Sequence, residues 1–214
     1  MIRLRITFEK KDALRYISHL DTQKVWTRAM LRANLPLAYT QGFHPVPKVA
    51  YAWPLPLGWS TKGELIDIWL DRDAEGFVPA EFIASINAGM PAGLRVLNAE
   101  VIDLFSDALT NVITSAIYRV VFPEGTSAET VREEMTALTA RETIEHERRG
   151  KVIDLKPLID SWEVSGSDGR AVMIIQMAAR NSAMGRPDEL LTELGYDMFR
   201  ASFERTAYIL AAGK

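Results

Sequence analysis

The 214-residue sequence contains no cysteine and no long apolar run. Without cysteine the chain cannot form disulfides, a thiolate nucleophile, a Cys-ligated zinc site or an iron–sulfur cluster. A membrane-spanning helix needs about 20 consecutive apolar residues. The N-terminal stretch "MIRLRITFEK" instead alternates charged and apolar residues, unlike a secretory signal. We therefore expect a soluble, cytoplasmic protein that makes no contact with a membrane.

Motifs of nucleotide-dependent and hydrolytic enzymes are also missing. The sequence has no Gly-rich nucleotide loop, no paired-carboxylate motif and no Ser-His-Asp order. Only three histidines are present. His19, His44 and Asp21 have the chemistry of metal ligands, but their spacing is not that of a close ligand set. We predict neither a metal site nor a bound cofactor on this chain.

Positive charge is concentrated in the first part of the chain. Residues 1–62 contain ten Lys or Arg and three acids, which gives a net charge of +7, whereas residues 63–214 carry a net charge of −10. Charge segregation of this kind predicts an anionic partner for the basic segment. Drift in composition between two subdomains would produce the same pattern without any partner.

The first half of the chain predicts strands and helices in the order βαββαβ. Residues 2–8 alternate apolar and polar side chains, as in a half-buried strand. Helical spacing follows over 12–33 and ends before Pro36, which cannot continue a helix. "KVAYAW" and "GELIDIWLD" are the next strands, "VPAEFIASINAGMP" contains a helix and "GLRVLNAEVID" is the last strand.

The second half predicts the same order. Its elements are the strand "NVITSAIYRVVF", a helix over 126–138 capped by Ser127 or Thr126, the extended "TIEHERRGKVIDL" turning at Gly150, the strand "AVMIIQMAA", the short helix "RPDELLTELG" and the strand "FRASFERTAYIL". We therefore predict an α+β fold of two tandem ferredoxin-like (βαββαβ) units packed as a duplicated α/β sandwich. The predicted domains are 1–104, with the basic helix and the "GFHP" loop, and 105–214.

The first helix carries a basic stripe. Lys24, Arg28 and Arg32 recur every fourth residue and therefore share one helix face. No Glu lies among residues 22–34 to neutralise them, which favours binding of phosphates over a merely solvated face. Asp21 precedes the helical run and is interpreted as its N-cap.

The segment "QGFHPVPK" is predicted to form a stiff loop, because Gly42 allows a positive φ and the prolines at 45 and 47 impose extended geometry. The loop presents Phe43, His44 and Lys48. An aromatic ring beside a basic residue is typical of sites that stack an unpaired base and hold its phosphate. A rigid turn with Phe43 packed inside is the alternative.

These residues also carry a resemblance to a known family. "RYISHLDTQKVWTRAMLRANLPLAYTQGFHPVPKVAYAWPLPLGWSTKGELIDIWL", together with "RRGKVIDLKPLI" and "GRPDELLTELG", resembles the radical-SAM-linked family of uncharacterised proteins, a domain of unknown function. The resemblance implies a partner, namely a cobalamin-binding radical SAM protein fused to or encoded beside this domain. The family's motif positions carried over here are Arg15, Ser18, His19, Asp21, Arg28, Gly42, Phe43, His44, Pro45, Pro47 and Lys48.

The leading hypothesis is a non-catalytic RNA-binding accessory of a radical SAM enzyme, acting in RNA modification or processing. Its predicted RNA- or anion-binding residues are Arg15, Lys24, Arg28, Arg32, Phe43, His44 and Lys48. One alternative is an RNA-modifying or RNA-cleaving enzyme that uses His19, His44 or Asp21, with a histidine as general base. Another is a protein-interaction module that docks on the radical SAM protein through its acidic second half and exposed tryptophans, for which the candidates are Trp53, Trp59, Trp69 and Trp162. Burial in a sheet is the alternative for these tryptophans and is favoured for Trp69.

Overall fold

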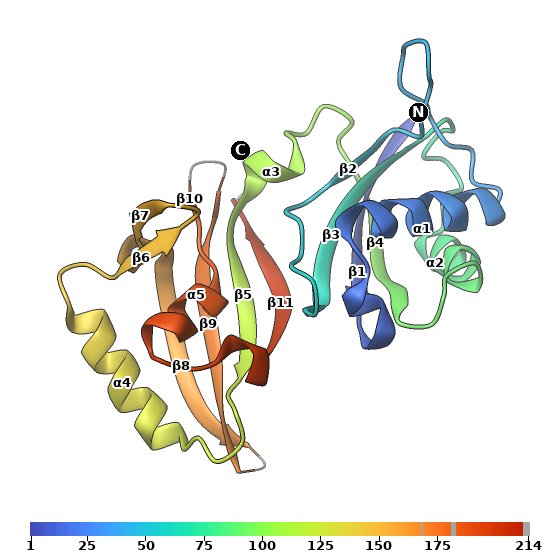
Figure 1. Ribbon diagram of the computed structural model, residues 1–214. Helices are drawn as coiled ribbons and strands as arrows, with labels where there is room; N and C mark the ends of the chain where they lie inside the picture. Colours follow the sequence, from blue (N-terminus) through green and yellow to red (C-terminus); the bar gives the residue numbers. More distant parts are fainter. Residues whose placement is uncertain (168, 181–182, 212–214) are drawn as a thin grey trace. The chain divides into compact units, whose positions relative to one another are not determined.

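The computed structural model describes residues 1–167, 169–180 and 183–211 (Figure 1). The chain divides into two compact units, residues 1–112 and 113–214. The limit between these units lies eight residues beyond the predicted domain boundary at 104/105. It coincides with the end of the short helix α3 (Leu109–Val112), which leads directly into the first strand of the second unit.

Unit 1 is built on an antiparallel sheet. Its strands are β1 (Ile2–Lys10), β2 (Val49–Tyr51), β3 (Ser60–Leu70) and β4 (Leu94–Ile102). β3 pairs with β2 on one side and with β1 on the other, and β1 pairs with β4, so the spatial order is β2–β3–β1–β4.

The core of unit 1 lies between one face of this sheet and two helices, α1 (His19–Arg32) and α2 (Pro79–Ala88) (Figure 1). α1 inserts Trp26 and Met30, and the ring of Trp26 meets Phe8 edge-on with centroids 5.0 Å apart. α2 begins at a proline and contributes Phe82 and Ile86. Each fully buried side chain of this size stabilises the fold by about 1.5–3 kcal/mol.

The opposite face of the unit 1 sheet carries a buried charge cluster. Asp67 is fully buried and accepts hydrogen bonds from Arg3, at 2.7 and 3.1 Å, and from Arg5, at 2.9 and 3.0 Å. Arg3 also donates to the backbone carbonyls of Ser106 and Asp107. Two of the cations that give residues 1–62 their positive charge are therefore buried, and they share one carboxylate that offsets one of their two charges.

The principal strands of unit 2 are β5 (Ile113–Val121), β8 (Ile159–Ser167), β9 (Arg170–Arg180) and β11 (Ser202–Leu210), which pair in the order β8–β9–β5–β11. The short β10 (Ala183–Met184) also pairs with β9. α4 (Ala128–Ala140) is capped by the Ser127 hydroxyl, as predicted, and packs against β8 and β9. α5 (Pro187–Glu193) begins at its proline.

The predicted extended segment 143–155 and its turn at Gly150 are confirmed, but this segment does not supply the strand beside β9 that the predicted βαββαβ order requires. It forms a separate hairpin of β6 (Glu145–Arg148) and β7 (Lys151–Asp154), which turns at Gly150 with φ of 76°. The strand beside β9 is β8, which the sequence pattern missed. β8 is mostly exposed and polar, and Val164 is its one buried side chain, so it has too little alternation to be recognised.

The predicted α+β class is confirmed by this arrangement of helices and antiparallel sheets. The tandem ferredoxin-like duplication stays a prediction. None of the helices in the described residues is long and apolar enough to cross a membrane.

Candidate functional site

Ser18 determines where α1 begins. Its hydroxyl accepts a hydrogen bond from the Asp21 backbone N–H at 3.0 Å, so Ser18 and not Asp21 is the N-cap. The Asp21 carboxylate accepts from the Ser18 hydroxyl at 2.8 Å and from Lys24 Nζ at 3.0 Å. These two hydrogen bonds lower the pKa of Asp21. The predicted cap was wrong because a serine three residues before the acid produces a reciprocal capping arrangement.

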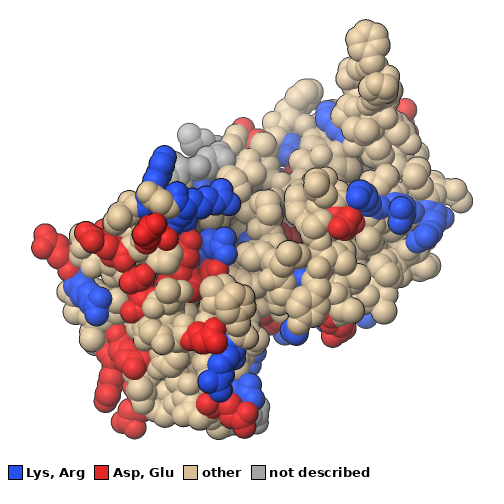
Figure 2. Space-filling model, viewed as in Figure 1, with Lys and Arg blue, Asp and Glu red and all other residues tan. Residues whose placement is uncertain are grey.

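The basic side chains of α1 lie in a row on its exposed face, and Figure 2 shows positive charge gathered over this helix. They are not equivalent. Lys24 is paired with Asp21, and the Arg32 guanidinium approaches the carbonyl of Gly89 at the end of α2, 3.5 Å away. Arg28 is exposed and makes no hydrogen bond or ion pair with the described residues. It is the cation of this row with the most freedom to bind a ligand.

The loop between α1 and β2 is a narrow hairpin that projects from unit 1 (Figure 1). Its two arms are joined by the hydrogen bond from the Thr40 N–H to the Val46 carbonyl, at 2.9 Å, and by a bridge between Tyr39 and Pro47. Gly42 has φ of 139°, which places Phe43 at the tip with its side chain fully exposed. Burial of Phe43 inside a turn is therefore excluded.

A groove runs between α1 and the base of this loop. The helix contributes Leu20, Gln23, Lys24, Thr27 and Arg28, and the opposite wall is formed by Val46, Pro47, Val49 and Tyr51. Its volume of about 560 Å³ is within the range of small-ligand sites. We call it the α1 groove. It combines two cations with apolar and aromatic walls, so it can hold an anionic group and an attached flat ring.

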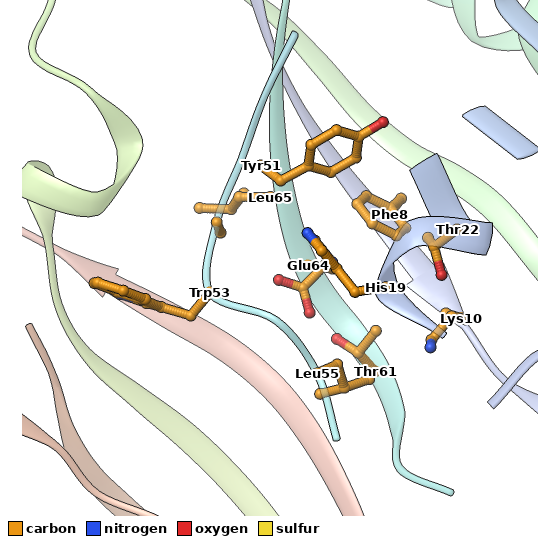
Figure 3. A pocket seen from close by; sticks show the side chains of 11 residues that line it. Phe8, Lys10, His19, Thr22, Tyr51, Trp53, Leu55, Thr61, Glu64 and Leu65 are labelled. Carbon is orange, nitrogen blue, oxygen red and sulfur yellow. The ribbon is translucent and has the colours of Figure 1, made fainter. Parts of the chain in front are cut away.

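A second, smaller cavity lies behind the groove, and Tyr51 lines both. Figure 3 shows this His19 pocket, in which the His19 ring lies between Tyr51 and Glu64. The rings of His19 and Tyr51 meet edge-on with centroids 5.5 Å apart. The pocket has a volume of about 20 Å³, which is room for about one water molecule. It can hold a proton or a water but not a nucleotide.

The protonation state of His19 follows from its surroundings. Burial lowers the pKa of His19; the nearby Glu64 carboxylate opposes this effect and the Lys10 ammonium adds to it. The imidazole is therefore neutral at pH 7. Its Nε2 lies 3.0 Å from the side-chain Nε2 of Gln23, one helical turn further along α1. Burial also raises the pKa of Tyr51, which keeps its hydroxyl protonated.

The predicted anion-binding residues are not all brought together. Val49 and Tyr51 pack toward the core, and because side chains alternate along a strand, Lys48 lies on the other face of the sheet. There its Nζ stands 4.8 Å from the centre of the Trp69 ring. Arg15 is stacked on Tyr16 at 4.7 Å and is no part of the groove. Lys48 and Arg15 therefore lie outside the α1 groove, and their assignment as anion-binding residues stays a prediction.

The three candidate catalytic residues are also dispersed. His19 lines its pocket, Asp21 is engaged with Ser18 and Lys24, and His44 is exposed on the projecting loop. Among the described residues, no hydrogen bond or ion pair joins any two of them, and no group of three His, Asp or Glu is placed to hold a metal ion. Of the candidate tryptophans, Trp59 and Trp69 are buried and not available for docking.

Comparison with known families adds one assignment. Residues 3–187 match the model of the family described as "Uncharacterized protein conserved in bacteria (DUF2344)". The chain belongs to the DUF2344 family. The matched region of DUF2344 includes both the α1 groove and the His19 pocket, and the family description contains no mention of radical SAM proteins.

Other comparisons are weak. No curated protein matches the sequence. Among solved structures, an unknown protein from Galdieria sulphuraria is similar over 99% of both chains, with 11% identity and a TM-score of 0.28. A likeness at this TM-score supports no conclusion about this DUF2344 protein.

Sequence reasoning missed several residues of the site. Gln23 and Tyr51 line the α1 groove, and Lys10 and Glu64 surround His19. Only the spacing of His19 and Gln23, which places them on one helix face, could have indicated a contact in advance. Lys10, Tyr51 and Glu64 come from three different strands, and nothing in their local sequence distinguishes them from ordinary sheet residues.

Proposed function

We propose that this DUF2344 protein binds single-stranded RNA, with the α1 groove as its binding surface. The observation that carries the proposal is the position of Arg28, an exposed cation without a partner among the described residues, on the wall of a groove that also presents Tyr51. Cationic grooves with aromatic side chains are the usual means of holding an unpaired strand. The fully exposed Phe43 at the tip of the adjoining loop supplies a second ring on which a base can stack.

The dispersal of His19, Asp21 and His44 favours binding over catalysis. A general base needs a partner that orients it and access to the proton it removes. Asp21 and His44 are exposed residues outside the His19 pocket, and that pocket is too small to admit a ribose. We therefore retain the non-catalytic accessory as the proposal. The radical SAM partner stays a prediction, to be tested by co-purification of the two proteins from an RNase-treated lysate.

The binding experiment compares two charge reversals. Arg28→Glu changes the α1 groove, whereas Arg95→Glu changes an exposed arginine on β4 that lines a different groove. We expect wild-type protein to bind a labelled single-stranded RNA at low salt, measured by fluorescence anisotropy. Loss of the Arg28 contact should reduce the slope of log K against log salt by about 0.7, and Arg95→Glu should leave the slope unchanged.

Three outcomes would count against the proposal. One is absence of binding at low salt, and another is an equal loss in both variants. The third is that an acidic peptide displaces the labelled RNA as effectively as unlabelled RNA of the same charge does. That result would assign the groove to a protein partner.

We also infer that the two units are ferredoxin-like repeats. The orders β2–β3–β1–β4 and β8–β9–β5–β11 support this inference, because each places the second, third, first and fourth principal strand of its unit side by side. The β6–β7 hairpin is then an insertion in the second repeat. An experimental structure with a different strand order in either unit would refute it.

A further inference from the structure

Gln23 links the α1 groove to His19. Its side chain lines the α1 groove, and its Nε2 lies 3.0 Å from Nε2 of His19. Gln23 itself is only partly exposed, and the His19 ring is held by its edge-on contact with Tyr51. The amide is therefore fixed at one end and faces the groove at the other.

The contact between these two nitrogens has a defined direction. An amide NH₂ group only donates hydrogen bonds, so His19 Nε2 must accept, which requires a neutral ring with its proton on Nδ1. The burial described above favours the neutral ring. The charged and titratable groups that face the ring are Lys10 from β1, Tyr51 from β2 and Glu64 from β3.

When His19 accepts from the Gln23 N–H that points away from Oε1, the other N–H and Oε1 form a donor and an acceptor side by side. One N–H is used by His19, and the second N–H and Oε1 are left for a ligand in the groove. Every unpaired nucleobase presents an adjacent donor and acceptor on its exposed edge, and proteins read single strands through such edges. A duplex hides these edges, and polyphosphate or an acidic surface has none.

We propose that Gln23 reads the edge of one unpaired base in the α1 groove, with His19 as the positioning residue that fixes the orientation of its amide. The inference rests on the proposed function and deepens it: the ligand is a single strand recognised through a base, with Arg28 holding its backbone and Tyr51 beside the ring. Protonation of His19 would turn its Nε2 into a donor. The Gln23 amide would then have to rotate, and its acceptor would be lost from the groove.

The test compares a short oligouridylate with polyphosphate of matched charge. Uracil offers a donor at N3 and an acceptor at O4, whereas polyphosphate has no base. Gln23→Met keeps the volume and helix propensity of the side chain but removes both polar atoms. We expect this variant to weaken oligouridylate binding by roughly fivefold or more and to leave polyphosphate binding unchanged. Arg28→Ala should weaken both.

The role of His19 is tested by pH. For wild-type protein, the ratio of oligouridylate to polyphosphate affinity should fall as the pH is lowered from about 6.5, the ordinary pKa of histidine, through the lower folded-state pKa at which His19 becomes protonated. His19→Gln places an amide oxygen near the position of Nε2, which accepts from Gln23 and does not titrate, so its ratio should stay constant. Equal pH dependence in both proteins would overturn the positioning role.

The failures of the two proposals are distinguishable. If neither ligand binds at low salt, the proposed function fails. If both bind and Gln23→Met affects neither, or both equally, the α1 groove is a general anion site and base reading by Gln23 is wrong.

Discussion

Replacement of Asp67 by Asn should severely destabilise unit 1. Asp67 is fully buried, and its carboxylate accepts four hydrogen bonds of 2.7–3.1 Å from Arg3 and Arg5, which are themselves 3% and 9% exposed. The amide has the same shape but carries no charge and turns donors toward the guanidinium groups. Removal of one partner from a buried ion pair costs about 3–5 kcal/mol, which is a large part of the about 5–15 kcal/mol that stabilises a typical domain.

Urea denaturation followed by tryptophan fluorescence measures this change. Four of the five tryptophans lie in unit 1, and the ring of Trp69 is 4.8 Å from the Arg3 guanidinium carbon. With a denaturant slope of about 1–3 kcal/mol per molar urea, we expect the midpoint to fall by roughly 2 M. The matched control is Asp71→Asn, an exposed residue just after β3, which should change stability by less than about 0.5 kcal/mol. A midpoint for Asp67→Asn equal to that of the control would refute the assigned role of the cluster.

Three further predictions concern the site. Asp21→Asn removes the carboxylate that pairs with Lys24, so RNA binding should tighten at low salt, and the slope of log K against log salt should become steeper by about 0.7. An unchanged slope would mean that Lys24 does not contact phosphate. Phe43→Ala should weaken RNA binding by roughly tenfold, because one stacked base contributes about 1–3 kcal/mol, and it should leave the melting temperature unchanged, because the ring is fully exposed. Phe43→Trp should retain the affinity. If the alanine variant binds RNA as tightly as wild-type protein, stacking on Phe43 is excluded. The folded-state pKa of His19 is lowered, so at acidic pH the unfolded chain binds a proton on this residue more readily than the folded chain does. The protein should therefore have its full stability above about pH 6.5, the ordinary pKa of histidine, and lose part of it as the pH falls through the folded-state pKa of His19. Thermal melts at a series of pH values should detect this loss in wild-type protein and a smaller one in His19→Gln, and identical profiles would contradict it.

The order of strands and helices in unit 1 could be predicted from sequence because each element is defined by local features. The alternation of Ile2, Leu4 and Ile6 and the helical spacing of Trp26 and Met30 mark the faces that form the core. The prediction failed for the mostly exposed β8, where the pattern contained too little contrast between buried and exposed positions.

The charge of the first segment was misleading for a physical reason. Net charge counts residues without regard to burial, and Arg3 and Arg5 are buried around Asp67, which lies 62 or more residues further along the chain. The stripe of Lys24, Arg28 and Arg32 needs only helical periodicity, so its existence was predictable. The pairing of Lys24 with Asp21 depends on which residue caps the helix, and the sequence pattern did not predict that residue.

The sequence alone determined that the protein has no cysteine chemistry, that its fold is α+β, that its first helix bears a cationic face and that a stiff loop follows it. These properties depend on residue type and on spacing within a few turns of chain. Only the tertiary structure decided that Lys48 faces away from that helix, that Gln23 meets His19, and that Tyr51 separates a groove from a pocket. Each of these facts depends on which face of a strand or helix meets a distant segment, and such long-range pairing is fixed by packing of the whole unit.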